Sequence, residues 1–403
     1  MVDASEARGY VAPGFEKVAE VLATTAEAAG EEGVGVAVTI EGEIVLDLSW
    51  GRTEGSPWTS DTLVCVYSCT KGMTALAAQI LADRGLLDVE APVARYWPEY
   101  AVNGKEDTLV SHFLNHSAGV LTFPRYWDLA GPDSSGLADF DAMVEQCAAA
   151  KPSWVPGTAA GYHALTFGWL VGELVRRIDG RSIGRFLAEE VTGPLGLEAY
   201  IGLPPELNGR VAPTLPARPM ADPAAQTAAD EALAKSQACL QAGDTESTEA
   251  LALACLFIHP HHPDYVGYLC DLMNNPAIRA AELPAGNAIA NAKGLAGFYA
   301  PLANDGTMPG GPRIVSPESI ERFRTPQPLP DGTPTGYGLG YGLLGEGFGG
   351  PGVEGEAFGH GGAGGNIGLA DPTRRLSYAY VKNRMVYDAE AAMAPLRALY
   401  TLL

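Results

Sequence analysis

The sequence predicts an α+β fold, in which an antiparallel β-sheet flanked by helices carries a mostly helical domain. Three observations predict it: a β-rich hairpin pattern near the N-terminus, helical periodicity in the middle, and strand patterns in the last third of the 403 residues. The order strands, helices, strands favours one sheet built from both ends of the chain. We therefore predict a sheet domain of residues 1–85 with 286–403 and a mostly helical domain of residues 86–285.

The N-terminal part predicts a helix, a hairpin and a second helix. Apolar residues at helical spacing indicate an amphipathic helix over residues 14–30. Two β-rich runs, residues 33–40 and 44–49, are separated by the turn signal at 41–43 and predict a hairpin. Residues 68–85 follow as a helix that ends at a C-terminal glycine.

The middle of the chain predicts helices joined by proline-marked loops. Residues 86–200 are mainly helical in pattern, most strongly at 165–178 and 182–191. Residues 203–250 are richer in Ala, Pro, Asp and Thr and predict long loops with a helical patch, which is either a lid over a site or a surface insertion. Helical pattern returns at residues 287–304.

The last third returns to strands. Residues 337–344 alternate like a strand and are followed by a glycine-rich stretch over 345–365. Two further strands are expected at 366–370 and 376–382, around an Asp-Pro turn. A helix over 389–402 closes the chain. We expect a sheet of at least five strands, with the site in the cleft beside the helical domain.

Composition narrows the classes of partner. Hydrophobic residues make up 47% and charged residues 18%, which is enough for a large core, and the net charge of −22 argues against nucleic acid or an anionic membrane as partner. We see no secretory signal and no membrane-spanning run, so we expect a cytoplasmic protein that takes a small-molecule substrate. The six cysteines lack CxxC spacing, so we expect free, buried thiols. They are residues 65, 69, 147, 239, 255 and 270.

Ser68 and Lys71 form the most informative motif. They stand three residues apart where an apolar run turns helical, so their side chains share one face of the helix. A serine hydroxyl needs a base to become a nucleophile, and a lysine in a dry pocket can lose its proton and supply that base. The N–H groups at the helix start can stabilise a developing oxyanion. The alternative is a helix-capping serine beside a solvated lysine.

Tyr162 is the second candidate. The Pro-Gly turn of residues 156–157 delivers it just before a predicted helix, where a phenol near a lysine could relay a proton. The alternative is a tyrosine that caps the turn and packs on the core. We expect His163 to be a neighbour rather than a participant.

The third candidate is His360-Gly361-Gly362, which we expect to precede a strand. Two glycines allow a substrate to approach the backbone, and the N–H of Ala363 could be the second oxyanion donor beside that of Ser68. His360 would donate a hydrogen bond to the substrate carbonyl or to Tyr162. A plain glycine-rich loop is the alternative.

Three competing sites are weaker. Cys69 adjoins Ser68, but its side chain points about 100° away around the helix. Ser117 lacks the first glycine of the G-x-S-x-G elbow, which disfavours an ordinary α/β-hydrolase. The cluster at 259–264 holds three histidines, but its prolines break ligand geometry and no HExxH is present. We therefore expect neither a metal nor a cofactor.

Taken together, these segments resemble the serine β-lactamase and penicillin-binding-protein superfamily, and most closely the class C β-lactamase-related esterases called family VIII carboxylesterases. The resemblance covers roughly residues 14–200 and 285–400. The segments that carry it are Tyr67-Ser-Cys-Thr-Lys-Gly, Leu114-Asn-His-Ser-Ala-Gly, Trp154 to Tyr162, Asn287 to Leu295, Tyr337-Gly-Leu-Gly-Tyr-Gly, and Gly359-His-Gly-Gly-Ala-Gly-Gly-Asn. The resemblance implies a β-lactamase/transpeptidase-like fold.

The resemblance also implies roles for the candidate residues. Ser68 matches the family's acylated nucleophile. Lys71 matches the lysine that is either the base or the group that keeps Tyr162 ionised, and Tyr162 matches the tyrosine that transfers protons. Two departures stand out: Ala164 replaces the asparagine of Tyr-x-Asn, and His360 replaces the lysine of Lys-Thr-Gly. Losing one charge-assisted contact costs about 1.5–3 kcal/mol, which favours uncharged acyl substrates.

We therefore expect a serine hydrolase of carboxylic esters. An acyltransferase on the same scaffold, an amidase or β-lactamase, and a catalytically silent binding protein stay as alternatives. The sequence leaves open the acyl and leaving groups, which of Lys71 and Tyr162 is the proximal base, the role of residues 203–250 and the oligomeric state.

Overall fold

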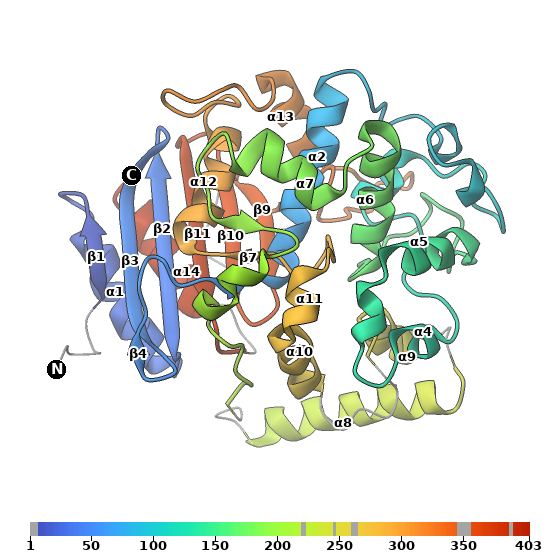
Figure 1. Ribbon diagram of the computed structural model, residues 1–403, viewed down its shortest axis with the longest axis horizontal. Helices are drawn as coiled ribbons and strands as arrows, with labels where there is room; N and C mark the ends of the chain where they lie inside the picture. Colours follow the sequence, from blue (N-terminus) through green and yellow to red (C-terminus); the bar gives the residue numbers. More distant parts are fainter. Residues whose placement is uncertain (1–6, 219–222, 245–246, 259–264, 345–355, 387–389) are drawn as a thin grey trace.

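An eight-stranded antiparallel sheet forms the centre of the protein, as seen in a computed structural model (Figure 1). The model describes residues 7–218, 223–244, 247–258, 265–344, 356–386 and 390–403. The strands, in spatial order, are β1 (Arg8–Val11), β3 (Glu43–Thr53), β2 (Gly33–Ile40), β11 (Leu376–Lys382), β10 (Asn366–Asp371), β9 (Phe358–Gly362) and β8 (Gly342–Leu343), with β4 (Ser56–Pro57) beside β3. The predicted α+β fold is confirmed, and both ends of the chain contribute to one sheet.

The hairpin of β2 and β3 shows how local sequence sets the register. Ile40 pairs with Glu43, so the connection is the two-residue loop Glu41-Gly42, and both residues have positive φ. This is the turn type whose twist suits a tight hairpin, and glycine adopts it without strain. β3 continues to Thr53, beyond the predicted end at residue 49.

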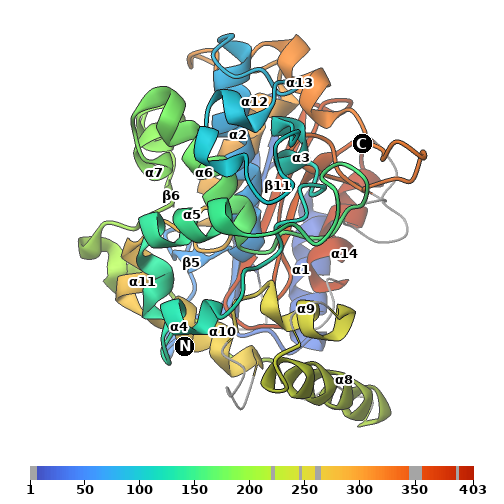
Figure 2. The ribbon, with the colours of Figure 1, turned by 90° about the vertical axis from the view of Figure 1, so that its right-hand side faces the viewer.

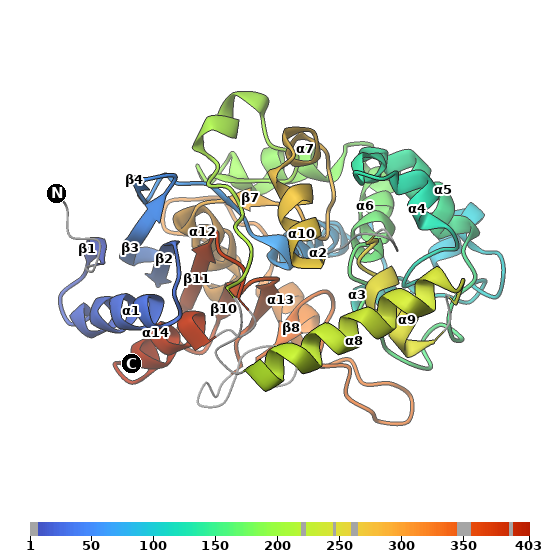
Figure 3. The same cartoon turned by 90° about the horizontal axis from the view of Figure 1, so that it is seen from below.

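Helices cover both faces of the sheet (Figure 3). One face is covered by α1 (Glu16–Ala28) and α14 (Glu390–Tyr400), and the other by α2 (Thr70–Asp83) and α12 (Ala292–Ala303). Val36 and Val38 of β2 pack in the α1–α14 core, while Ala37 between them packs in the core that holds α12. Because both faces are covered, β2 is apolar throughout rather than alternating.

The middle of the chain supplies helices beside the sheet, as expected. These are α3 (Val110–Leu114), α4 (Tyr126–Ala130), α5 (Phe140–Ala149), α6 (Thr166–Asp179), α7 (Ile183–Leu187), α8 (Pro223–Gln241), α9 (Thr248–Ala254), α10 (Tyr265–Asn274) and α11 (Pro276–Ala280), with α13 (Pro317–Arg324) later in the chain. The predicted insertion holds α8 and α9, which lie together at one end of the molecule (Figure 2). Among the described residues, no helix combines the length and apolar character needed to cross a bilayer.

Smaller elements complete the connections. Short 3₁₀ helices are η1 (Tyr67–Cys69), η2 (Val93–Arg95), η3 (Pro98–Tyr100), η4 (Ser135–Ala138) and η6 (Pro205–Arg210), and η5 (Ala188–Thr192) is a π-helical turn. A second, three-stranded sheet has the order β5 (Val64–Cys65), β7 (Ile289–Ala290) and β6 (Ala199–Tyr200). The predicted helix over 287–304 therefore begins only at Ala292, after β7. The proposed division into two domains stays a prediction.

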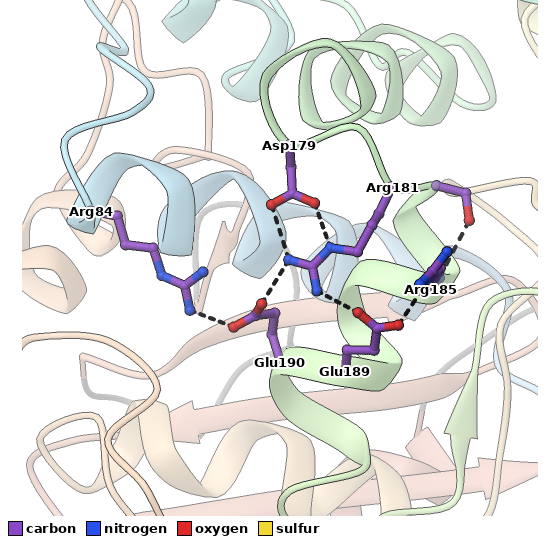
Figure 4. Close-up of polar contacts among 7 residues, drawn as sticks. Arg84, Asp179, Arg181, Arg185, Glu189 and Glu190 are labelled. Carbon is purple, nitrogen blue, oxygen red and sulfur yellow. Dashed lines mark hydrogen bonds and ion pairs between the residues drawn. The ribbon is translucent and has the colours of Figure 1, made fainter.

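An ion-pair network ties the helical part to the end of α2 (Figure 4). Arg181 lies at its centre and binds Asp179, Glu189 and Glu190 at once. Glu190 also binds Arg84, the C-terminal capping residue of α2. The network therefore fixes α7 and η5 against the helix that begins beside Ser68.

One prediction for the last third is wrong, and one strand there was not predicted. Residues 337–344 do not form a continuous strand, because only Gly342 and Leu343 lie in β8, and Tyr337 turns back to pair with Gly342. His360-Gly361-Gly362 precedes the strand β10, as expected, but the triplet itself lies within a further strand, β9, that the sequence did not predict. The histidine cluster at 259–264 lies outside the described residues.

Candidate active site

Ser68 and Lys71 lie at the junction between η1 and α2. The Lys71 Nζ is 3.3 Å from the Ser68 Oγ and donates to the carbonyl oxygens of Ala164 at 2.7 Å and Ala285 at 2.9 Å. Lys71 is fully buried, and this burial lowers the pKa of its amine from 10.5 to about 7. A neutral amine has two N–H groups, which suit the two carbonyls, and one lone pair, which is then free for the Ser68 hydroxyl.

The backbone before Ser68 adopts a conformation that is rare for a non-glycine residue. Tyr67 has a φ of 48°, and its carbonyl accepts a hydrogen bond from the Thr70 hydroxyl. The N–H of Ala288 donates to that same hydroxyl oxygen at 2.9 Å. Ser68 therefore lies in a 3₁₀ turn before the helix rather than in its first turn, and strand β7 holds that turn in place.

Tyr162 approaches the same point from the loop before α6. Its ring centroid lies 4.7 Å from the Lys71 Nζ, and the Ser68 side chain lies near enough to the phenol to oppose the effect of burial on its pKa. The residue is 37% exposed, yet burial of its hydroxyl end raises the pKa of the phenol well above 10, and Tyr337 raises it further. The structure thus brings the predicted hydroxyl, amine and phenol together, with the phenol protonated at neutral pH.

His360 lies on β9, across from η1. Cys69 donates from its thiol to the His360 carbonyl at 3.2 Å, and a Cβ on Gly362 would lie 2.3 Å from the Val66 carbonyl oxygen. β9 therefore passes directly beside the turn that carries Ser68. Gly361, Gly362 and Ala363 are partly exposed there. Among the described residues, the backbone bonds of the loops, turns and helix caps include none donated by the N–H group of Ser68 or of Ala363.

The His360 ring differs from the predicted hydrogen-bond donor. Its Nδ1 lies 2.6 Å from the Gly361 carbonyl oxygen, so this nitrogen carries the proton. Burial, and then the charge of Lys71, lower the pKa of the imidazole to about 3. The ring is therefore neutral and its Nε2, which is buried, is an acceptor with no partner among the described residues.

Sequence reasoning missed three residues around this centre. The His116 ring centroid lies 4.9 Å from that of Tyr162 and 4.5 Å from that of Tyr337. Cys255, the C-terminal capping residue of α9, interacts electrostatically with both Lys71 and Tyr162. The motifs around His116 and Tyr337 were visible in the sequence, but nothing local to Cys255 connects it to the site. The segment that directly follows the predicted insertion of residues 203–250 thus contributes a side chain to the surroundings of Lys71.

Ala164 and the cysteines are the remaining residues for which the sequence made a prediction. Ala164 contributes its carbonyl to Lys71, which any residue at that position could do. All six cysteines are free, as expected, but Cys239 and Cys255 are only partly buried. Burial raises the pKa of the Cys69 thiol far above its ordinary value, which argues against this residue as a nucleophile.

Comparisons with known proteins find similarity to beta-lactamases and esterases. A family model described as "Beta-lactamase" matches residues 18–402. The esterase/beta-lactamase LipL of Mycobacterium tuberculosis is 34% identical over 389 residues, covering 94% of this chain and 83% of LipL. A family VIII carboxylesterase structure has a TM-score of 0.80 at 34% identity, covering 99% of this chain and 100% of the other. EstA from Arthrobacter nitroguajacolicus Rue61a has a TM-score of 0.75 at 28% identity, covering 98% and 97%.

Proposed function

The chain belongs to the beta-lactamase family, and we propose that it is a serine hydrolase that cleaves carboxylic esters through an acyl-enzyme on Ser68. The observation that carries this proposal is the buried Lys71 amine, which lies 3.3 Å from the Ser68 Oγ and has a pKa of about 7. Such an amine is largely unprotonated just above neutral pH, as a general base must be. The names of LipL, the family VIII carboxylesterase and EstA support an esterase.

In the first half-reaction, neutral Lys71 takes the proton of Ser68 as the Oγ attacks the ester carbonyl carbon. The protonated amine is then stabilised by the carbonyls of Ala164 and Ala285 and by the face of the Tyr162 ring. The N–H groups of Ser68 and Ala363 are proposed to bind the oxyanion.

Collapse of the tetrahedral intermediate breaks the bond to the leaving alkoxide. Tyr162 keeps its proton at neutral pH, so it can donate that proton to the alkoxide. The alcohol leaves with the proton of the phenol, and the proton that Lys71 took from Ser68 then restores the phenol. In the second half-reaction, neutral Lys71 takes a proton from water as the water oxygen attacks the acyl carbon. Collapse of this second tetrahedral intermediate breaks the bond to the Ser68 Oγ, which takes that proton from Lys71 as the acid leaves.

The charges around the site favour uncharged esters. His360 stands where the family carries a lysine, and its pKa of about 3 leaves it neutral. The site therefore offers no permanent cation at this position for a substrate carboxylate, and Ala164 offers no side-chain amide. Weak β-lactam hydrolysis is a second candidate, because the name of LipL joins both activities.

The test is turnover of p-nitrophenyl acetate beside nitrocefin, with Ser68→Ala as the matched variant. We expect wild type to hydrolyse the ester well and nitrocefin poorly, and a fluorophosphonate to add its phosphonyl group to Ser68 with loss of fluoride. Mass spectrometry of the labelled protein locates the adduct. Ester turnover that survives in Ser68→Ala would refute the proposal.

A further inference from the structure

His116 occupies the space behind the proposed proton donor. It is 2% exposed, and its ring lies against the rings of Tyr162 and Tyr337. Its φ of 64° is in the left-handed region, which only a few per cent of non-glycine residues adopt, although asparagine, aspartate and histidine do so more often than the others. Such a conformation persists only when the surrounding contacts hold it.

The backbone on both sides of Tyr162 is bound to His116. The Gly161 N–H donates to the His116 carbonyl at 3.0 Å, and the His163 N–H donates to the His116 Nδ1 at 3.1 Å. Together with the ring contact, three contacts from one residue span positions 161 to 163. The next residue, Ala164, supplies the carbonyl that binds Lys71.

The neutral state of His116 is required for this arrangement. A protonated Nδ1 cannot accept the His163 N–H. Burial, followed by the repulsion that a proton here would meet from protonated His163, Lys71 or His360, holds the pKa of His116 well below 6.5, so the imidazole is neutral at ordinary assay pH. The acceptor is thus present whenever Lys71 is able to act as a base.

We propose that His116 is a positioning residue that holds the Tyr162 phenol in reach of Ser68, by binding the Gly161 and His163 backbone and packing on the Tyr162 ring. The inference rests on the proposed function, in which Tyr162 donates a proton to the leaving group. A misplacement of about 1 Å can cost roughly a hundredfold in rate, so the loss of this support is measurable.

Two substitutions separate the acceptor from the ring. His116→Asn places an oxygen near the position of the Nδ1 and tolerates positive φ. His116→Phe keeps a ring but has no acceptor. His112→Phe is the matched control, because the His112 Nδ1 also accepts a backbone N–H, from Leu109 at 3.2 Å, in the same segment.

For ethyl butyrate, whose alkoxide needs a proton in order to leave, we expect His116→Phe to lower kcat/KM by about 10- to 100-fold, mainly in kcat, and His116→Asn by less than about threefold. The control should stay within about threefold of wild type. Thermal unfolding verifies that each variant folds, and His116→Ala replaces His116→Phe if the latter does not. Equal losses in His116→Asn and His116→Phe would overturn the proposal.

The double variant with Tyr162→Phe gives the sharper test. If His116 acts through the phenol, His116→Phe should cause little further loss once the phenol is gone. If the two losses multiply, the positioning role is refuted while the esterase stands. If Ser68→Ala keeps full activity, the proposed function itself is refuted and this inference falls with it.

Discussion

Replacing Lys71 with methionine should change how stability depends on pH. Burial lowers the pKa of the folded-state amine from 10.5 to about 7, whereas the unfolded chain keeps its lysine protonated up to about pH 10. Between these values the unfolded state binds more protons, so the free energy of unfolding rises with pH. From pH 6 to pH 9 the wild type should gain about 3 kcal/mol more than Lys71→Met, which lacks this group.

The slope is a cleaner quantity than the absolute difference between the two proteins. At any one pH, the variant sheds a buried charge but leaves the Ala164 and Ala285 carbonyls without their donor, at about 1–3 kcal/mol each. These losses do not vary with pH, so they cancel from the comparison. Urea unfolding of both proteins at pH 6, 7, 8 and 9 measures the slope. Parallel profiles would show that Lys71 is protonated throughout and would remove the proposed base.

Three further predictions follow from the same contacts. The kcat/KM for p-nitrophenyl acetate should rise about tenfold from pH 6 to pH 8, because the neutral fraction of Lys71 rises as pH passes about 7; a flat profile would contradict this. Arg181→Met should lower the free energy of unfolding, measured in urea, by about 1–3 kcal/mol, because Asp179, Glu189 and Glu190 lose their partner. The loss should be smaller in 1 M salt, which screens the charges. An unchanged urea midpoint would count against the network. Gly362→Ala should lower the melting temperature, because its Cβ would lie 2.3 Å from the Val66 carbonyl oxygen. Gly361→Ala is the control, because its Cβ would meet no atom closer than 3.9 Å. Equal melting temperatures of the two variants would refute this packing.

Much of the fold was accessible from the sequence because its local signals agree with its packing. The turn at 41–43 fixed the hairpin, and the apolar runs at 366–370 and 376–382 became β10 and β11. Ser68, Lys71 and Tyr162 were found because a three-residue spacing and a Pro-Gly turn are local features. Their convergence was a prediction that the structure bears out in geometry, while their roles stay proposals.

The remaining features depend on contacts between distant segments. β9 was missed because glycine has low strand propensity, yet a Cβ on Gly359 would lie 2.1 Å from the Gly368 carbonyl oxygen, so the neighbouring strand demands glycine there. The tautomer of His360 depends on one hydrogen bond to its neighbour, and the place of Cys255 depends on where α9 ends relative to the distant Lys71. No local pattern contains this information.

The order of the sheet has a consequence for how the protein is made. β2 is synthesised early, but its outer neighbour β11 is encoded more than three hundred residues later. During translation the N-terminal hairpin therefore carries an apolar strand with one edge unpaired, the kind of surface on which nascent chains aggregate. The yield of folded protein therefore depends on whether that edge stays shielded until the last strands leave the ribosome. A change in the rate at which the final segment is synthesised should change the fraction of the protein that is soluble rather than in inclusion bodies.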